Sequence, residues 1–308
     1  MGTLTKGCYK PPIACHLLCT AARSANLTRN PSLSLLHVVI LAIVQGITEF
    51  LPISSSGHLV LAWEAFDAAQ MTAIEQSEAD RLTLDIAVHV GTLAAVCLYA
   101  WREIGQMAGG VAQLALGRWT PGARLAALVV VGTLPLIAVG GLFKDEITAI
   151  LRDTAVVAWA TIGFGIVLFI ADRSTLTFRR IDHMTFAAGF FIGLSQVLAL
   201  IPGTSRSGIT MTAARALGFE RVEAARFSLL LAIPAILGAG SLAGYDLYES
   251  GNMQLGLEAL VGAALSFGVA LLAIVLMIGW LRRASFTPFV IYRIVLGSVL
   301  LWWVYGTP

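Results

Sequence analysis

Two short runs in the sequence place hydroxyl, glycine and charged residues inside otherwise apolar stretches. They are Pro52-Ile53-Ser54-Ser55-Ser56-Gly57-His58 and Pro202-Gly203-Thr204-Ser205-Arg206-Ser207-Gly208. A loop of this kind that starts a helix exposes backbone N–H groups that bind anions, and an arginine within it favours phosphate. Glu49 supplies a carboxylate for a divalent metal or a general base, and a serine near His58 is the minimum for nucleophilic attack. The pattern predicts phosphoryl-transfer chemistry.

The charged residues in these stretches are candidates for function, because a charge at bilayer depth costs about 2.5 to 3.5 kcal/mol on insertion scales. They are Glu49, Arg206 and, nearer a helix end, Arg215. The candidate site collects the polar residues of both stretches: Gln45, Glu49, Ser54, Ser55, Ser56, His58, Gly203, Thr204, Ser205, Arg206 and Ser207. The alternative is structural: Glu49 and Arg206 form a buried ion pair, and the hydroxyls cap helices.

Composition indicates where these residues lie. The 308-residue chain is 57% hydrophobic and only 12% charged, against roughly 25% charged in a soluble domain. This argues against a soluble enzyme and predicts an all-α polytopic membrane protein. Six uninterrupted apolar stretches are long enough to cross a bilayer: 84–101, 125–143, 154–171, 227–245, 257–280 and 288–305.

The N-terminal residues 1–34 differ from the rest because they carry four basic residues and no acid. We interpret them as a presequence or a disordered extension outside the membrane domain. The remaining chain has a small acidic excess, so nothing supports binding to nucleic acid.

Two further apolar regions, 35–66 and 184–217, contain the polar runs at their centres. Proline and clustered hydroxyls cannot continue a lipid-facing helix, and irregular backbone at membrane depth needs protein or water around it. We therefore expect two re-entrant helix-loop-helix hairpins, each followed by three transmembrane helices. An odd number of crossings makes the halves, 35–171 and 184–308, inverted repeats.

Loop charges predict the orientation, because basic residues in short loops stay in the cytoplasm. Three segments with excess basic charge are expected inside: 102–124, 172–183 and 281–287. Three acidic segments are expected outside: 67–83, 144–153 and 246–258. The first hairpin then opens to the outside.

The polar runs also carry a family resemblance. Residues 44–59 and 200–208 closely resemble the two signature motifs of bacterial undecaprenyl-diphosphatases of the bacitracin-resistance (BacA/UppP) type. Residues 85–92, 226–234 and 288–294 are similar to further stretches of that family, so the resemblance extends from about residue 35 to the end.

This resemblance implies a multi-pass inner-membrane phosphatase, with its active site open to the periplasmic side. Such an enzyme converts undecaprenyl diphosphate to the monophosphate carrier for cell-wall synthesis and lowers sensitivity to bacitracin. It acts with Mg²⁺ or Ca²⁺ on a polyprenyl diphosphate lipid within the bilayer; a homodimer is left open.

The family's functional residues fall on Glu49, Ser54, Ser55, His58 and Arg206. Gln45 stands where many members have a second glutamate, which leaves a metal to be held by Glu49, substrate phosphate oxygens and water. We expect Arg206 and the loop N–H groups to clamp the diphosphate, and Ser55, His58 or water to be the nucleophile.

Two other classes of membrane protein share features with this sequence. A lipid-carrier transporter or flippase shares the architecture of broken helices at the midplane. A phosphatase of the phosphatidic-acid type is disfavoured because residues 207–216 contain no histidine. Asp85 and His89 are expected to be structural, and Arg293 to snorkel to the interface or to form a pair.

Overall fold

The computed structural model describes residues 35–69, 78–142, 154–174, 177–250 and 253–306. The expected extension at 1–34 and the expected acidic loop at 144–153 lie outside these ranges. Within them the regular elements are helices, apart from an isolated bridge between Arg179 and Phe219. The all-helical expectation is confirmed for the part of the chain that is described.

In the described part of the chain, five helices are long and apolar enough to cross a membrane. They are α4 (Glu78–Tyr99), α6 (Pro121–Leu142), α8 (Thr154–Ser174), α12 (Met253–Leu281) and α13 (Thr287–Gly306). Each coincides with a predicted span, and the remaining predicted span at 227–245 falls within α11 (Arg221–Ser250). The protein is thus a multi-pass membrane protein.

Both remaining apolar regions break where the polar runs predict. The first forms α2 (Leu35–Thr48) and α3 (Ser55–Ala68). The second forms α9 (Phe186–Gln196), the short helix η2 (Val197–Leu200) and α10 (Arg206–Ala216).

The two breaks have the same local geometry. Ser54 caps α3 by accepting from the Gly57 N–H, and Ser205 caps α10 by accepting from the Gly208 N–H. Their φ angles are 74° and 72°, and no other non-glycine residue in the described ranges has a positive φ. Such a conformation costs on the order of 1 to 3 kcal/mol and persists only where the surrounding structure imposes it.

The segment 102–124 was expected to be a loop, but it contains α5 (Trp101–Leu114). Ile104 and Met107 pack against the core beside α6, while most other side chains of α5 are exposed. Its polar face and glycines lower the mean hydropathy, so this amphipathic helix does not stand out from the sequence.

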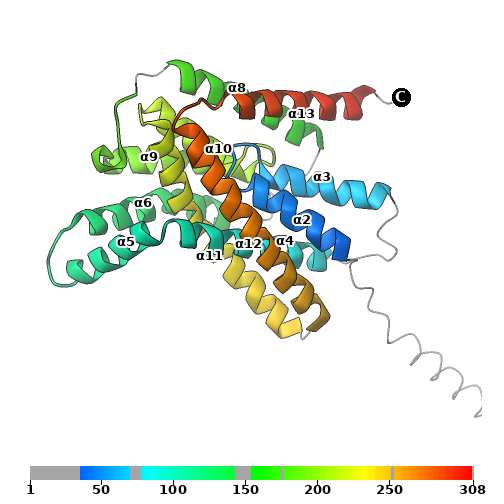
Figure 1. The fold of residues 1–308 in the computed structure, drawn as a ribbon, viewed down its shortest axis with the longest axis horizontal. Helices are drawn as coiled ribbons and strands as arrows, with labels where there is room; N and C mark the ends of the chain where they lie inside the picture. Colours follow the sequence, from blue (N-terminus) through cyan, green and yellow to red (C-terminus); the bar gives the residue numbers. More distant parts are fainter. Residues whose placement is uncertain (1–34, 70–77, 143–153, 175–176, 251–252, 307–308) are drawn as a thin grey trace, which may run out of the picture.

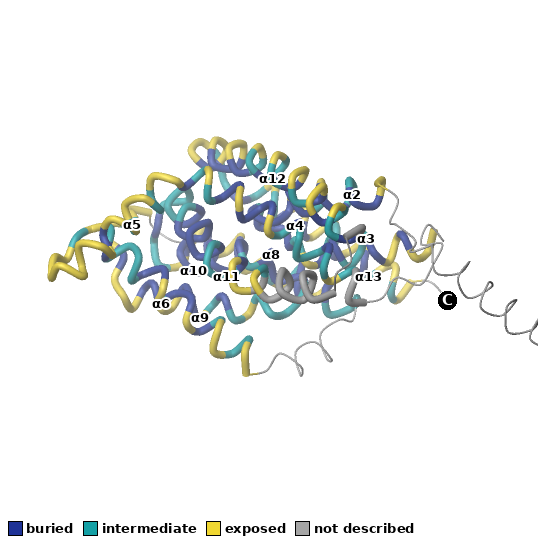
Figure 2. Tube along the Cα trace, turned by 90° about the horizontal axis from the view of Figure 1, so that it is seen from below, coloured by how far each residue is buried: buried dark blue, intermediate teal, exposed yellow. Residues whose placement is uncertain are grey.

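The helices pack as crossing pairs (Figure 1). Helices α8 and α13 lie side by side along one edge, and α12 packs on α4 and α2. Buried residues follow the inner faces of the helices, whereas the outer faces are exposed (Figure 2). These outer faces carry large apolar residues, including Val130, Leu134 and Ile137 on α6 and Leu272, Val275 and Leu276 on α12. Such surfaces suit contact with acyl chains.

Candidate active site

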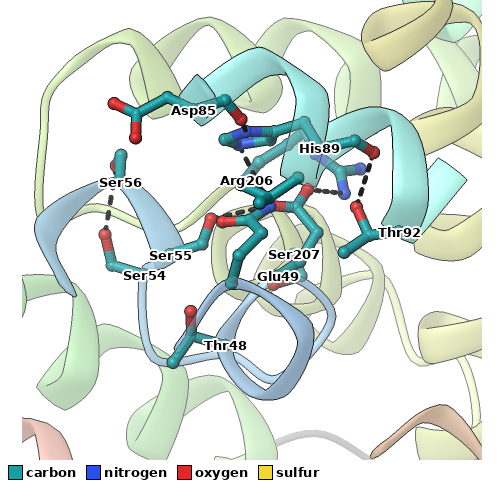
Figure 3. A network of polar contacts seen from close by, with 12 residues as sticks. Thr48, Glu49, Ser54, Ser55, Ser56, Asp85, His89, Thr92, Arg206 and Ser207 are labelled. Atoms are coloured by element: carbon teal, nitrogen blue, oxygen red, sulfur yellow. Dashed lines mark hydrogen bonds and ion pairs between the residues drawn. The ribbon is translucent and has the colours of Figure 1, made fainter. Parts of the chain in front are cut away.

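The centre of the site is a contact between the two broken regions. Glu49 continues the last turn of α2, and Arg206 is the first residue of α10. The Arg206 Nη2 atom donates to Glu49 Oε1 at 3.0 Å, although 157 positions separate the two residues (Figure 3). Their side chains are 14% and 5% exposed. The two loops therefore converge as the sequence analysis expected.

The other carboxylate oxygen of Glu49 faces a ring of polar groups. Glu49 Oε2 accepts from Gln45 Nε2 at 2.9 Å and from Ser55 Oγ at 2.6 Å. His89 Nε2 lies 3.5 Å from the same oxygen. An amide, a hydroxyl and an imidazole thus surround this oxygen, so Glu49 is placed to exchange a proton with Ser55.

His89 belongs to the site, whereas the sequence analysis favoured a structural role. Its Nδ1 atom lies 2.6 Å from the Asp85 carbonyl oxygen, and a carbonyl only accepts, so Nδ1 carries the hydrogen. A second proton on Nε2 would make an ion pair with Glu49. The family-like stretch 85–92 was the signal that could have identified His89.

His58 has other partners than Ser55. Its Nδ1 atom donates to the Ser54 carbonyl oxygen, and its Nε2 atom lies 2.6 Å from the Tyr292 hydroxyl. The two rings stack with an interplanar angle of 11°. The Ser–His pair that their closeness in the sequence suggests is therefore not formed between Ser55 and His58, because the Ser55 hydroxyl donates to Glu49. Tyr292 therefore belongs to the surroundings of the site, although its position within an apolar stretch gave no sign of this.

The remaining predicted residues line the two loops. Ser54 Oγ lies 3.4 Å from Ser56 Oγ, and Ser205 Oγ lies 3.1 Å from Ser207 Oγ. Ser207 also donates to the Leu51 carbonyl oxygen at 2.9 Å, which joins the second loop to the first.

The segment before Ser205 is tightly packed. Gly203 has a φ of 91°, and a Cβ there would clash with the Val157 backbone in α8. Thr204 is fully buried, and its hydroxyl has no hydrogen-bond partner among the described residues. The first turns of α3 and α10 add backbone N–H groups that have no acceptor within their helices. These donors can bind an anion.

Two arginines that the sequence places within apolar stretches, Arg215 and Arg293, lie outside the Glu49 cluster. Arg215 is buried and donates to Asp172 Oδ1 at 2.9 Å and to the Phe219 carbonyl oxygen at 2.6 Å. Arg293 does not snorkel and forms no ion pair with a described residue. It is 0% exposed and donates to backbone carbonyl oxygens of both loops and of α8.

A metal ion would find few protein ligands here. The described residues contain no group of three or more His, Cys, Asp or Glu side chains that could hold one. However, the buried Gln45 Oε1 atom has no hydrogen-bond partner and sits one helical turn before Glu49. Carboxylate and amide oxygens are ligands that Mg²⁺ and Ca²⁺ prefer. Because Gln45 Nε2 is the atom that faces Glu49, the amide must flip for both oxygens to hold one cation, which would take its other ligands from phosphate and water.

The fold and the site together define a multi-pass membrane protein with a buried centre suited to a phosphorylated head group. Residues 38–299 match the family model described as bacitracin resistance protein BacA, and the chain belongs to this family.

Proteins of known name are similar over most of their length. Undecaprenyl-diphosphatase 1 of Rhodospirillum rubrum is 48% identical over 273 residues, which cover 87% of this chain and 94% of that protein. The undecaprenyl-diphosphatase of Roseobacter denitrificans is 42% identical, covering 89% of this chain and 100% of its own. That of Alteromonas mediterranea is 46% identical with the same coverage.

Proposed function

We propose that this protein hydrolyses undecaprenyl diphosphate to undecaprenyl phosphate and inorganic phosphate. This reaction recycles the lipid carrier for cell-wall synthesis and lowers sensitivity to bacitracin. The observation that carries the proposal is the 2.6 Å hydrogen bond from Ser55 to Glu49, because the Glu49–Arg206 ion pair and the serine caps are what the structural alternative also predicts, whereas a hydroxyl paired with this carboxylate is what nucleophilic attack needs. Membership of the BacA family and the names of the relatives support the same substrate.

The geometry favours Ser55 as the nucleophile. Glu49 takes the Ser55 proton while Ser55 Oγ attacks the terminal phosphorus, and the bridging P–O bond breaks to release the lipid monophosphate. Water then attacks the phosphoserine and the Ser55 Oγ–P bond breaks. Glu49 returns its proton to Ser55 Oγ, and inorganic phosphate leaves with the protons of the water. Arg206 and the N–H groups at the starts of α3 and α10 stabilise the phosphate charge.

A divalent cation, Mg²⁺ or Ca²⁺, fits this proposal as a cofactor. Glu49 and the unpartnered Gln45 Oε1 would hold it, and it would neutralise charge on the diphosphate.

We further infer that the two broken regions are re-entrant hairpins within inverted repeats, in the inner membrane, and that the site opens to the periplasm. Gln45, Ser54 and Ser56 recur at the same spacing as Gln196, Ser205 and Ser207. The equal φ angles of Ser54 and Ser205 support this internal relationship. The distribution of basic and acidic loop residues supports the orientation.

The direct test is phosphate release from undecaprenyl diphosphate by purified protein in detergent. We expect release by the wild type, loss of release with a chelator, and loss in Arg206→Ala and Glu49→Ala. Detergent micelles have no two compartments, so this assay also separates hydrolysis from lipid transport. An Arg206→Ala variant that stays active, also in the presence of the chelator, would remove the phosphate clamp from the proposal. An inactive wild type would favour the transporter.

A further inference from the structure

Arg293 of α13 donates hydrogen bonds to both loops of the site. Its Nη1 atom donates to the Pro52 carbonyl oxygen of the first loop at 3.2 Å and to that of Thr204 in the second loop at 3.0 Å. Its Nη2 atom donates to the Gly203 carbonyl oxygen at 2.9 Å. One side chain thus binds Pro52, two residues before the strained cap of α3, and Thr204, directly before the strained cap of α10.

The same guanidinium group also binds α8. Arg293 Nε donates to the Thr161 carbonyl oxygen at 2.9 Å, and Nη2 donates to that of Ala160 at 3.4 Å. A guanidinium has five N–H bonds in a fixed plane, and these five carbonyl oxygens satisfy all of them. Lysine has three donors on a flexible stem and cannot reproduce this arrangement.

We propose that Arg293 is a positioning residue for the phosphatase reaction, an inference that rests on the proposed function. By fixing the carbonyl oxygens of Pro52 and Thr204, Arg293 sets the backbone that leads into Ser54 and Ser205. The C=O and N–H of a trans peptide point in opposite directions, so the Thr204 contact turns the Ser205 N–H away from Arg293. Arg293 therefore determines how Ser55 and Arg206, one residue after each cap, are presented to the substrate.

Two glycines provide the space that Arg293 needs. A Cβ on Gly165 of α8 would lie 3.2 Å from Arg293 Cβ and 3.3 Å from Nε. A Cβ on Gly208 of α10 would lie 3.0 Å from Arg293 Nη1. An alanine at position 165 would push the arginine by a few tenths of an ångström, since the three atoms nearest to its Cβ all belong to Arg293.

This crowding gives a test with a matched control. Gly165→Ala displaces Arg293, whereas Gly163→Ala adds the same methyl group on the same helix where nothing lies within 4 Å. Because small displacements of catalytic groups lower the rate strongly, we expect Gly165→Ala to lower kcat about three- to tenfold per folded molecule. Gly163→Ala should keep the wild-type kcat and KM.

A substitution of Arg293 itself tests the hydrogen-bond pattern. Arg293→Lys keeps the positive charge but loses at least two of the five contacts, so kcat should fall at least about tenfold. Activity is compared per folded molecule, with the folded fraction taken from size-exclusion chromatography and thermal unfolding. If Gly165→Ala and Arg293→Lys lower only the unfolding temperature and keep the wild-type kcat and KM, Arg293 only holds the fold and the proposal is overturned.

A measurement independent of activity completes the test. Hydrogen–deuterium exchange should increase together in residues 52–58 and 203–208 of Arg293→Lys, while α5 exchanges as in the wild type. Unchanged exchange in either loop would overturn the proposal even if the wild type hydrolyses the lipid. If the wild type is inactive but Arg293→Lys increases hydrogen–deuterium exchange in both loops, the proposed function is overturned. The role of Arg293 in linking the two loops is then still supported.

Discussion

Ser55 and Glu49 share a hydrogen bond of 2.6 Å across the break between α2 and α3. This contact gives the serine a proton acceptor that comes from its own broken region, and it leaves His58 paired with Ser54 and Tyr292. Arg206, from the second region, holds the other carboxylate oxygen. The acid, the hydroxyl and the guanidinium are thus arranged around one point.

Glu49→Gln keeps the size of the side chain but removes its charge and its ability to take a proton. We expect kcat for phosphate release to fall about 10²- to 10⁴-fold, the usual contribution of a general base. Glu64→Gln is the control, because Glu64 is an exposed carboxylate on α3 that accepts from Thr154 at 3.0 Å. Retention of a tenth of the activity in Glu49→Gln would contradict the role of Glu49 as the base.

Ser55→Ala and Ser56→Ala distinguish the nucleophile from its neighbour. Ser55→Ala should abolish turnover, while Ser56→Ala should stay within about threefold of the wild type, because the Ser56 hydroxyl is hydrogen-bonded to Ser54 Oγ at 3.4 Å and not to Glu49. Rapid quenching with terminally labelled substrate should trap an acid-stable phosphoserine in the wild type and none in Ser55→Ala. An acid-labile label would point instead to His58, and no label to direct attack by water.

His89→Asn tests the contact with Glu49 through a double-mutant cycle. Alone it should lower kcat about tenfold, and in Glu49→Gln it should add little, because its partner charge is already gone. His58→Asn combined with Glu49→Gln should instead be close to additive, since His58 does not contact Glu49. Additive losses for the His89 pair would show that the 3.5 Å approach has no role in turnover.

The metal prediction concerns Gln45. Gln45→Glu adds a second carboxylate and should lower the Mg²⁺ concentration for half-maximal activity about tenfold, whereas Gln45→Leu should raise it by a similar factor. Gln196→Leu is the matched control, because Gln196 is also fully buried and its Oε1 also has no hydrogen-bond partner among the described residues. One helical turn after Gln196 stands Leu200, whereas one turn after Gln45 stands Glu49. An unchanged Mg²⁺ requirement in both Gln45 variants would exclude Gln45 as a ligand.

Asp172→Asn should affect stability and not catalysis. Asp172 accepts from Arg215 and Arg221 at 2.9 and 2.8 Å, and the Asp172 and Arg215 side chains are 2% and 1% exposed. Leaving Arg215 buried without its partner should lower the free energy of unfolding by about 3 to 5 kcal/mol. Glu220→Gln, which breaks the exposed pair with Arg180, should cost less than about 1 kcal/mol. Unfolding in detergent measures both, and kcat per folded molecule should stay at the wild-type value.

The helices and their breaks could be read from local sequence, because hydropathy, proline and clustered hydroxyls act within a few residues of one another. The runs around Ser54 and Ser205 marked both helix starts, and the charges Glu49 and Arg206 stood out against their apolar surroundings. The amphipathic helix α5 was missed because its hydropathy is low and only one face is packed.

Which groups meet at the site depends on contacts between distant helices, and no local pattern encodes these. His89 reaches Glu49 because α4 packs beside α2, and Tyr292 and Arg293 reach the loops because α13 lies against α8. The same arginine could have snorkelled to the interface from an isolated helix. Only the packed arrangement, in which five carbonyl oxygens surround its guanidinium, makes burial of that charge favourable.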